Sequence, residues 1–421
     1  MNPISPRYAN YVLGLLFVVY VFNFIDRQIL TILLEPIKQE LQVSDTAMGF
    51  LTGIAFALFY TVAGIPIARW ADRGTRRTII ALGIAVWSVM TAFSGLARSF
   101  PQLALARIGV GVGEAAASPP AHSLISDYFP PERRATALGI YTMGAYLGIL
   151  FGLLLGGWIN EFFGWRMAFF VVGLPGLVLA LVVRLTLREP PRGHSEGLTD
   201  PGEQQSTREV LRYLWALRSF RHLSIAAALY GFAGYGFGAW APAFLMRVHD
   251  MGTGETATWL GLSIGLGGAA GAYLGGRISD GLGASDARWF MRVPALGALA
   301  AIPFYVLFLF LPDKLLALLF FIPAAVLSAF YVGPTFAMTQ GLAKLHMRAL
   351  ASAILLFILN LIGLGLGPLA VGILNDLLAG EFGKEAIRYS LLITGVTNLW
   401  AVRHSFLAAR TLREDLRAKE R

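Results

Sequence analysis

Long apolar stretches recur along the chain and are separated by short polar connections. Each is long enough to supply the roughly 20 residues that a helix needs to cross the hydrocarbon core of a bilayer. The pattern therefore predicts an all-α integral membrane protein with twelve transmembrane helices. The apolar segments fall approximately at 8–34, 45–69, 77–97, 101–128, 134–160, 164–187, 221–247, 255–279, 289–311, 314–341, 349–377 and 387–409.

One polar stretch is much longer than the others and follows the sixth apolar segment. Its prolines and glycines are typical of a linker. We therefore expect two six-helix bundles, at residues 1–188 and 221–421, joined by a linker at 189–220. An internal repeat supports the two halves, because the second and eighth spans both end in small residues followed by an aspartate, Asp72 and Asp280.

Composition agrees with a membrane protein, since 56% of the residues are hydrophobic, 14% are charged and the mean hydropathy is +0.63. The absence of cysteine excludes disulfides and thiolate metal sites, and we expect no cofactor or metal. The net charge of +9 is scattered over separate loops, which argues against a nucleic-acid partner. Basic residues favour alternate connections, so both termini and the linker are expected in the cytoplasm. The short loops favour a bacterial inner (plasma) membrane.

The connection after the second span carries a family resemblance. It is similar to the Gly-x-x-x-Asp-Arg-x-Gly-Arg-Arg signature of the major facilitator superfamily, although Ala68 and Thr75 stand where glycines are usual. Three shorter motifs resemble the Spinster family of lipid transporters within that superfamily: Asp26-Arg27, the segment 111–115 and the segment 127–134.

The resemblance implies a monomeric secondary transporter that works by alternating access on an amphipathic anion, such as a lysophospholipid or a sphingosine-phosphate-like lipid. Its other expected partners are protons and membrane lipids. It also implies a charge network that closes the cytoplasmic face. The residues expected in this gating network are Asp72, Arg73, Arg76, Arg77, Asp127, Glu132, Arg134 and Asp280.

Four charged residues lie inside expected spans: Asp26, Arg27, Arg107 and Glu114. A charge there costs several kcal/mol, from about 2.5 to above 10, so it survives mainly beside a partner or a wet cavity. Arg107 and Glu114 are seven residues apart and share one helix face, about 10 Å apart along the axis. Asp26 reaches a compatible depth on the first span, so an Asp26–Arg107–Glu114 network is possible.

This network has two interpretations. If a substrate anion competes with Asp26 or Glu114 for Arg107, substrate binding and protonation become coupled. The alternative is a static buried ion pair that orients the helices. Arg27 lies about 100° around the helix from Asp26, so only one of the two is expected to face the cavity. Arg27 is either a substrate ligand or a structural contact.

The remaining candidates are aromatic residues and one histidine. Tyr230, Tyr235 and Trp240 in the seventh span offer ring surfaces to an acyl chain, or they pack against neighbouring helices. His122 could relay protons, although a structural role beside two prolines is the simpler interpretation.

No nucleotide-binding loop, zincin helix or nucleophile elbow occurs in a suitable setting, so we expect neither an enzyme nor an ATP-driven pump. The sequence predicts a proton-coupled transporter with Arg107 as anion anchor and Asp26 and Glu114 as proton-coupling carboxylates. A transporter of small organic anions and a non-coupled lipid facilitator or scramblase are the alternatives.

Overall fold

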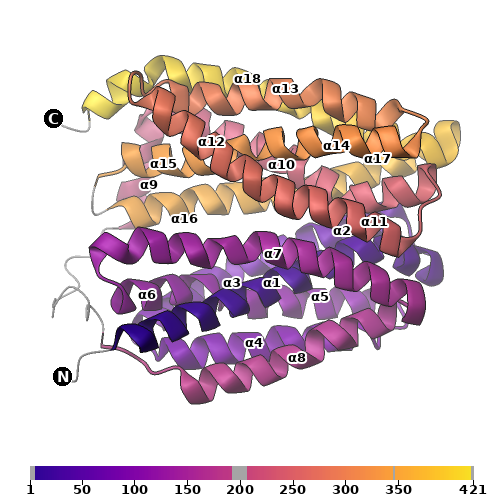
Figure 1. Cartoon of the computed structure of the whole chain (residues 1–421), viewed down its shortest axis with the longest axis horizontal. Coiled ribbons are helices and arrows are strands. Elements are labelled where there is room, and N and C mark those ends of the chain that lie inside the picture. The colour runs from indigo at the N-terminus through magenta and orange to yellow at the C-terminus, as the bar shows by residue number, and fades with distance from the viewer. Residues whose placement is uncertain (1–4, 192–205, 345–346, 419–421) are drawn as a thin grey trace. The chain divides into compact units, whose positions relative to one another are not determined.

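The computed structural model describes residues 5–191, 206–344 and 347–418, without the side chains at 65, 72, 131, 132, 135, 349 and 418 (Figure 1). The described chain is built from helices and short connections, which confirms the expected all-α class. Contacts divide it into two units. The first contains Met1–Val43, Ala55–Glu203 and Gly252–Gly261, and the second contains Ser44–Ile54, Gln204–Met251 and Leu262–Arg421.

The first unit carries the four charged residues of the expected spans. Its helices are α1 (Pro6–Leu41), α3 (Ile54–Arg73), α4 (Arg76–Ser94), α5 (Phe100–Glu114), α6 (Ser118–Tyr128), α7 (Pro131–Phe163), α8 (Trp165–Thr186) and α11 (Thr253–Leu260). The last of these comes from the second half of the sequence, yet its contacts place it in this unit.

The second unit contains one short helix from the first half of the sequence, α2 (Asp45–Thr52). Its other α-helices are α9 (Thr207–Ala216), α10 (Arg218–Val248), α12 (Gly268–Gly283), α13 (Trp289–Phe310), α14 (Lys314–Ser328), α15 (Val332–Leu342), α16 (Arg348–Ile358), α17 (Gly367–Phe382) and α18 (Ala386–Ala418). Among the described residues, two π-helical stretches, η1 (Gly261–Gly267) and η4 (Leu359–Leu366), and two 3₁₀ turns, η2 (Ala329–Tyr331) and η5 (Gly383–Glu385), occur between the α-helices.

Eight helical stretches of the described chain are long and apolar enough to cross a membrane. The expected fourth span is divided between α5 and α6, and the expected eighth one between α11, η1 and α12, so these pieces are shorter. Large apolar side chains cover the outside, with Phe163 71%, Leu185 70% and Leu105 68% exposed. Such a surface is favourable in lipid and unfavourable in water.

A stripe of glycines on α7 sets the position of α1. A Cβ atom at Gly148 would lie 2.4 Å from the Cβ of Phe24, and one at Gly152 would lie 2.9 Å from the carbonyl oxygen of Ile25. Small residues at these positions let two helix backbones approach closely inside a membrane. The stretch of α1 that carries Asp26 therefore packs closely against this glycine stripe of α7.

Candidate functional site

A buried ion pair of the first unit joins α1 to α5. The Arg27 Nη2 atom lies 2.7 Å from Glu114 Oε2, and the Arg27 Nε atom donates to the same oxygen over 3.0 Å. Arg27 Nη2 also donates to Asn23 Oδ1 over 3.3 Å, one helical turn earlier. The side chain of Glu114 is fully buried and that of Arg27 is 10% exposed. Both charges are therefore shielded from water and neutralised by each other.

Aromatic rings surround the Arg27 guanidinium. Its central carbon lies 4.8 Å from the ring centre of Phe24, 4.9 Å from that of Phe56 and 5.1 Å from that of Tyr60. The last two rings come from successive turns of α3 and stack on each other. A cation over an aromatic face gains about 0.5–2 kcal/mol, more where water is excluded. These rings hold the guanidinium in place and give the site an apolar wall.

The second guanidinium of the site, Arg107, is also buried but makes looser polar contacts. Its central carbon lies 4.5 Å from the ring centre of Phe56, which thus contacts both arginines. Its Nη1 atom donates to the backbone oxygen of Asp26 over a long 3.4 Å. Arg107 is 6% exposed, and its Nε atom has no hydrogen-bond partner in the described residues. A buried donor without an acceptor is unfavourable, so this arginine retains unused capacity to bind an anion.

The carboxylate of Asp26 is 1% exposed and lies in the electrostatic field of Glu114 and Arg107. Neither of its oxygens has a hydrogen-bond partner among the described residues. Thr91 and Trp87 of α4 are close to it but outside hydrogen-bonding geometry. Asp26 can therefore take up a proton without breaking an ion pair, which Glu114 cannot.

The structure thus brings all four predicted core residues together in one unit, but in a different pairing from the one the sequence favoured. Glu114 pairs with Arg27, whereas Arg107 forms no ion pair with either carboxylate among the described contacts. Arg27 contacts Glu114 directly, and the buried Asp26 carboxylate lies in the electrostatic field of the same residue. Which of the two faces a cavity stays a prediction.

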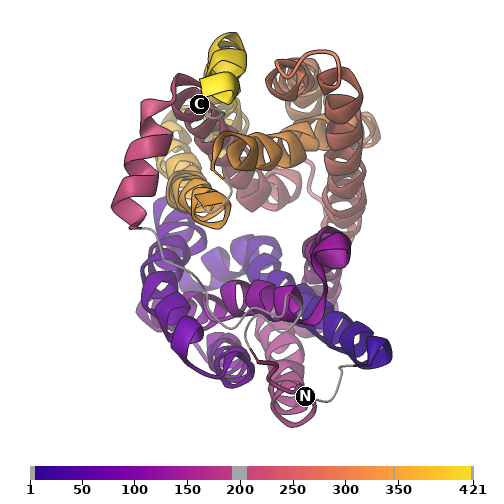
Figure 2. The same cartoon turned by 90° about the vertical axis from the view of Figure 1, so that its left-hand side faces the viewer.

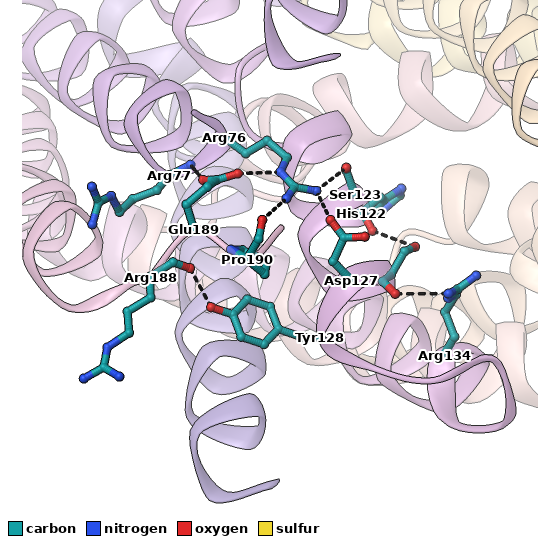
Figure 3. Close-up of polar contacts among 11 residues, drawn as sticks. Arg76, Arg77, His122, Ser123, Asp127, Tyr128, Arg134, Arg188, Glu189 and Pro190 are labelled. Atoms are coloured by element: carbon teal, nitrogen blue, oxygen red, sulfur yellow. Dashed lines mark hydrogen bonds and ion pairs between the residues drawn. The ribbon is translucent and has the colours of Figure 1, made fainter. Parts of the chain in front are cut away.

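A second polar cluster, which we call the Arg76 network, lies at the end of the first unit where α4 begins (Figure 3). Arg76 is 1% exposed and pairs with Asp127 of α6. Its Nε atom donates to Glu189 Oε1 over 2.7 Å and its Nη1 atom to Ser123 Oγ over 2.7 Å. Its Nη2 atom donates to the carbonyl oxygen of Pro190 over 3.1 Å. Four hydrogen bonds from this guanidinium thus tie α4 to α6 and to the chain that follows α8.

The segment after α8 is fastened by further contacts (Figure 3). The backbone N–H of Arg77 donates to Glu189 Oε2 over 2.9 Å, and its side chain donates to the Leu187 carbonyl oxygen over 3.1 Å. The hydroxyl of Tyr128 donates to the Arg188 carbonyl oxygen over 2.5 Å. Four of the expected gating residues therefore have a defined place: Arg76, Arg77 and Asp127 within this network, and Arg134 beside it through a 3.0 Å bond to the Ser126 carbonyl oxygen.

The other four expected gating residues are not placed in the network. The side chains of Asp72 and Glu132 lie outside those that the structure describes. Arg73 and Asp280 are exposed, and their side chains have no described polar contact. In the second unit the charged cluster near Asp280 is instead centred on Asp286, which contacts Arg288, Arg292 and Arg413.

The aromatic candidates of α10 are enclosed by their own unit. Trp240 is fully buried, and its indole N–H donates to the Pro368 carbonyl oxygen over 2.8 Å. The Tyr230 hydroxyl lies 3.1 Å from Ser405 Oγ of α18, and Tyr235 packs against the core cluster of this unit. These contacts favour the helix-packing interpretation. His122 of α6 packs edge-on against Tyr141, which favours its structural interpretation.

Comparison with known proteins identifies the family of this chain. The model of the Major Facilitator Superfamily matches residues 16–368. The chain belongs to this superfamily. Its members are membrane transporters, so the protein is an integral membrane transporter. In the described residues there is no cluster of three or more His, Cys, Asp or Glu side chains that could hold a metal ion.

Relatives narrow the family further. This transporter is 35% identical to a solved bacterial homologue of the human lysosomal transporter Spinster, described as inward-facing and unoccupied, with a TM-score of 0.90 over 98% of this chain and 99% of that one. It is 34% identical to an MFS-type efflux pump of Mycolicibacterium smegmatis, over 98% of this chain and 95% of the pump. It is 29% identical to a probable L-galactonate transporter of Escherichia coli, over 64% of this chain and 61% of that one. The Spinster resemblance is confirmed.

Sequence reasoning missed several residues of both clusters. Phe56 and Tyr60 stand four positions apart, a spacing that marks one helix face, but nothing in the sequence shows that this face meets Arg27. Asn23 is one turn before Arg27 and could have been found by that spacing. Glu189 gives no comparable signal, because its neighbouring prolines are typical of a linker.

Proposed function

We propose that this transporter moves a monoanionic amphipathic substrate together with a proton, through the site formed by Asp26, Arg27, Arg107 and Glu114. The observation that carries the proposal is the charge balance of this buried site. It holds two guanidinium groups and two carboxylates, so it is neutral when empty and deprotonated. A proton on one carboxylate leaves one positive charge, which a single anion neutralises.

The contacts suggest how the two events are linked. Glu114 is held by Arg27, whereas the Asp26 carboxylate has no hydrogen-bond donor and Arg107 has no ion-pair partner in the described residues. We assign the proton to Asp26 and the anion to Arg107, with Glu114 as the second coupling carboxylate. A buried uncompensated charge costs several kcal/mol, so the proton and the anion each favour the binding of the other.

The substrate class follows from the walls of the site. Phe24, Phe56 and Tyr60 place apolar surface directly around a cation. That combination suits a charged headgroup attached to an apolar chain, such as a lysophospholipid, and the Spinster resemblance supports it. A small sugar acid is the second candidate, favoured by the similarity to the L-galactonate transporter. We place the protein in a bacterial inner membrane with both termini in the cytoplasm.

The test is uptake of labelled lysophosphatidylglycerol by proteoliposomes, with and without a pH gradient. Asp26→Asn and Glu114→Gln each fix one carboxylate in a form that resembles its protonated state. Both should retain substrate exchange at equal pH and lose the response to the gradient. Glu381→Gln is the matched control, because this carboxylate of α17 is exposed and outside the site. It should behave as the wild type.

Three results would contradict parts of the proposal. Uptake that ignores the gradient in the wild type would remove proton coupling and favour a facilitator or scramblase. A response to the pH gradient that persists in both variants would show that neither Asp26 nor Glu114 carries the coupled proton. Uptake of L-galactonate without uptake of the lysolipid would show that the substrate is a sugar acid. Proton coupling would then be tested with L-galactonate in the same two variants.

A further inference from the structure

The linker between the two halves ends in a helix, α9, that the transport site does not use. Its buried stripe consists of Val210 and Leu214, both 0% exposed, which pack into the core cluster of the second unit. The Tyr213 hydroxyl adds a 3.3 Å hydrogen bond to the Leu342 carbonyl oxygen at the end of α15. Figure 2 shows α9 running across the ends of the membrane helices of its unit rather than along them.

Next to the buried stripe, α9 exposes two large apolar side chains. Leu211 is 42% exposed and Trp215 is 45% exposed. They are four residues apart, so they form one stripe on the helix surface. Transfer of these two large apolar side chains from water to an apolar medium is favourable.

The polar residues of α9 follow in a fixed rotational order. At 100° per residue, the exposed apolar pair is followed by a basic stripe, Arg208 and Arg212, both exposed. Glu209, the acidic residue of α9, lies beyond that stripe and about 140° from the centre of the apolar pair. Going around the helix axis in one direction, the buried stripe is therefore followed by the exposed apolar pair, then by the two arginines, and then by the acidic Glu209.

This order matches the cross-section of a membrane surface. Helices in the interfacial plane place Trp and Leu at the headgroup–acyl boundary and basic residues at the headgroups. The helix also directly precedes α10, the helix of the expected seventh span, which begins at Arg218, two residues after α9 ends. Arginine donors pair bidentately with phosphate, and anionic lipids attract each basic residue near the surface.

We propose that α9 lies in the membrane interface and binds anionic phospholipid headgroups through Arg208 and Arg212, with Leu211 and Trp215 inserted beside the acyl chains. The surface is separate from the transport site, and its occupant is a lipid of the surrounding leaflet. The proposal does not rest on the proposed substrate or on proton coupling.

The absence of cysteine from the sequence allows a direct test with single reporters in the full-length protein. Leu211→Cys and Ala216→Cys, each carrying an environment-sensitive fluorophore, are reconstituted in phosphatidylcholine containing equal amounts of either brominated phosphatidylglycerol or brominated phosphatidylcholine. Both positions are exposed, so neither reporter disturbs the buried stripe. We expect brominated lipid to quench the reporter at 211 and to leave the one at 216 bright.

The charge preference is measured by the ratio of quenching by the two brominated lipids at position 211. An attraction of about 1 kcal/mol for each basic residue corresponds to a preference of about fivefold per arginine. Arg208→Gln combined with Arg212→Gln should bring the ratio close to one. Glu209→Gln is the matched control on the same helix and should leave the preference at least as strong.

The proposal fails if brominated lipid quenches neither position, which would indicate that the apolar stripe faces water or a protein partner. It also fails if quenching at 211 is equal for the two lipids in the wild type, or if the preference survives in the double arginine variant. Inorganic phosphate in the buffer should not abolish the preference; if it does, the arginines bind free anions rather than headgroups.

Discussion

Removing the guanidinium of Arg76 should destabilise the first unit more than removing any neighbouring positive charge. Arg76 is 1% exposed and contacts two carboxylates, Asp127 and Glu189, together with Ser123 and the Pro190 carbonyl oxygen. Replacing it with alanine leaves all four acceptors without their donor. The perturbation therefore tests whether this network holds α4, α6 and the segment after α8 together.

The magnitude follows from the burial of the partners. Removing one partner of a buried ion pair costs about 3–5 kcal/mol, because the other charge remains in a medium of low polarity. Here the side chains of Asp127 and Glu189 retain 11% and 25% exposure, so water compensates part of their charge. We expect Arg76→Ala to lower the free energy of unfolding by about 3 kcal/mol, at the lower end of that range.

Arg73→Ala is the matched control. This arginine lies three positions earlier in the same motif, is exposed and has no described polar contact. Surface substitutions of this kind usually change stability by less than about 0.5 kcal/mol. Both variants are unfolded with denaturant in detergent micelles and followed by helical circular dichroism. Helical signal reports the described chain directly, because it is built from helices.

A double-mutant cycle with Glu189→Gln separates the ion pair from general damage. The two residues share a direct 2.7 Å contact, so their effects should fall short of additivity by about 0.5–3 kcal/mol. Two results would refute the reasoning. One is an Arg76→Ala protein that unfolds at the same denaturant concentration as Arg73→Ala, and the other is strict additivity in the cycle.

Three further predictions test other contacts. Asp376→Asn should lower the free energy of unfolding by about 0.5–2 kcal/mol, because the Asp376 carboxylate accepts hydrogen bonds from the first backbone N–H groups of α2 over 3.1 and 2.8 Å. Unfolding with denaturant measures this change. Gly113→Ala should lower the free energy of unfolding by about 1–3 kcal/mol, since the added Cβ would lie 2.6 Å from the backbone nitrogen of Trp87. Gly139→Ala is the control and should leave stability unchanged, because nothing lies within 4 Å of its added Cβ. Thermal unfolding of the two variants measures the difference. Partial desolvation opposes charge on Asp286, but hydrogen bonds from a backbone N–H and an arginine outweigh it and lower the pKa of this carboxyl. The ionised Asp286 carboxylate should stabilise the folded protein above the unfolded pKa of about 4, and this stabilisation should be lost as the pH falls through the lower folded pKa. In an acid titration, Asp286→Asn should therefore lose less stability than the wild type over this pH range.

Much of the fold could be predicted from the sequence because membrane helices depend on local composition. A run of about 20 apolar residues has no other way to satisfy its backbone in lipid, so the segments at 134–160 and 164–187 could be assigned without any neighbour. The buried charges could be found for the same reason, since Asp26 and Glu114 are conspicuous against an apolar background. The Asp72 repeat and the motifs around it pointed to the family.

The pairing of these charges was decided only by tertiary structure. Glu114 selects Arg27 rather than Arg107 because helix rotation and side-chain reach set distances that sequence spacing does not contain. The capture of Glu189 by Arg76 joins residues 113 positions apart. The capping of α2 by Asp376 joins segments more than 300 positions apart. Contacts of this range depend on how glycine stripes and helix ends pack, whereas the helices themselves depend on neighbours within a few turns.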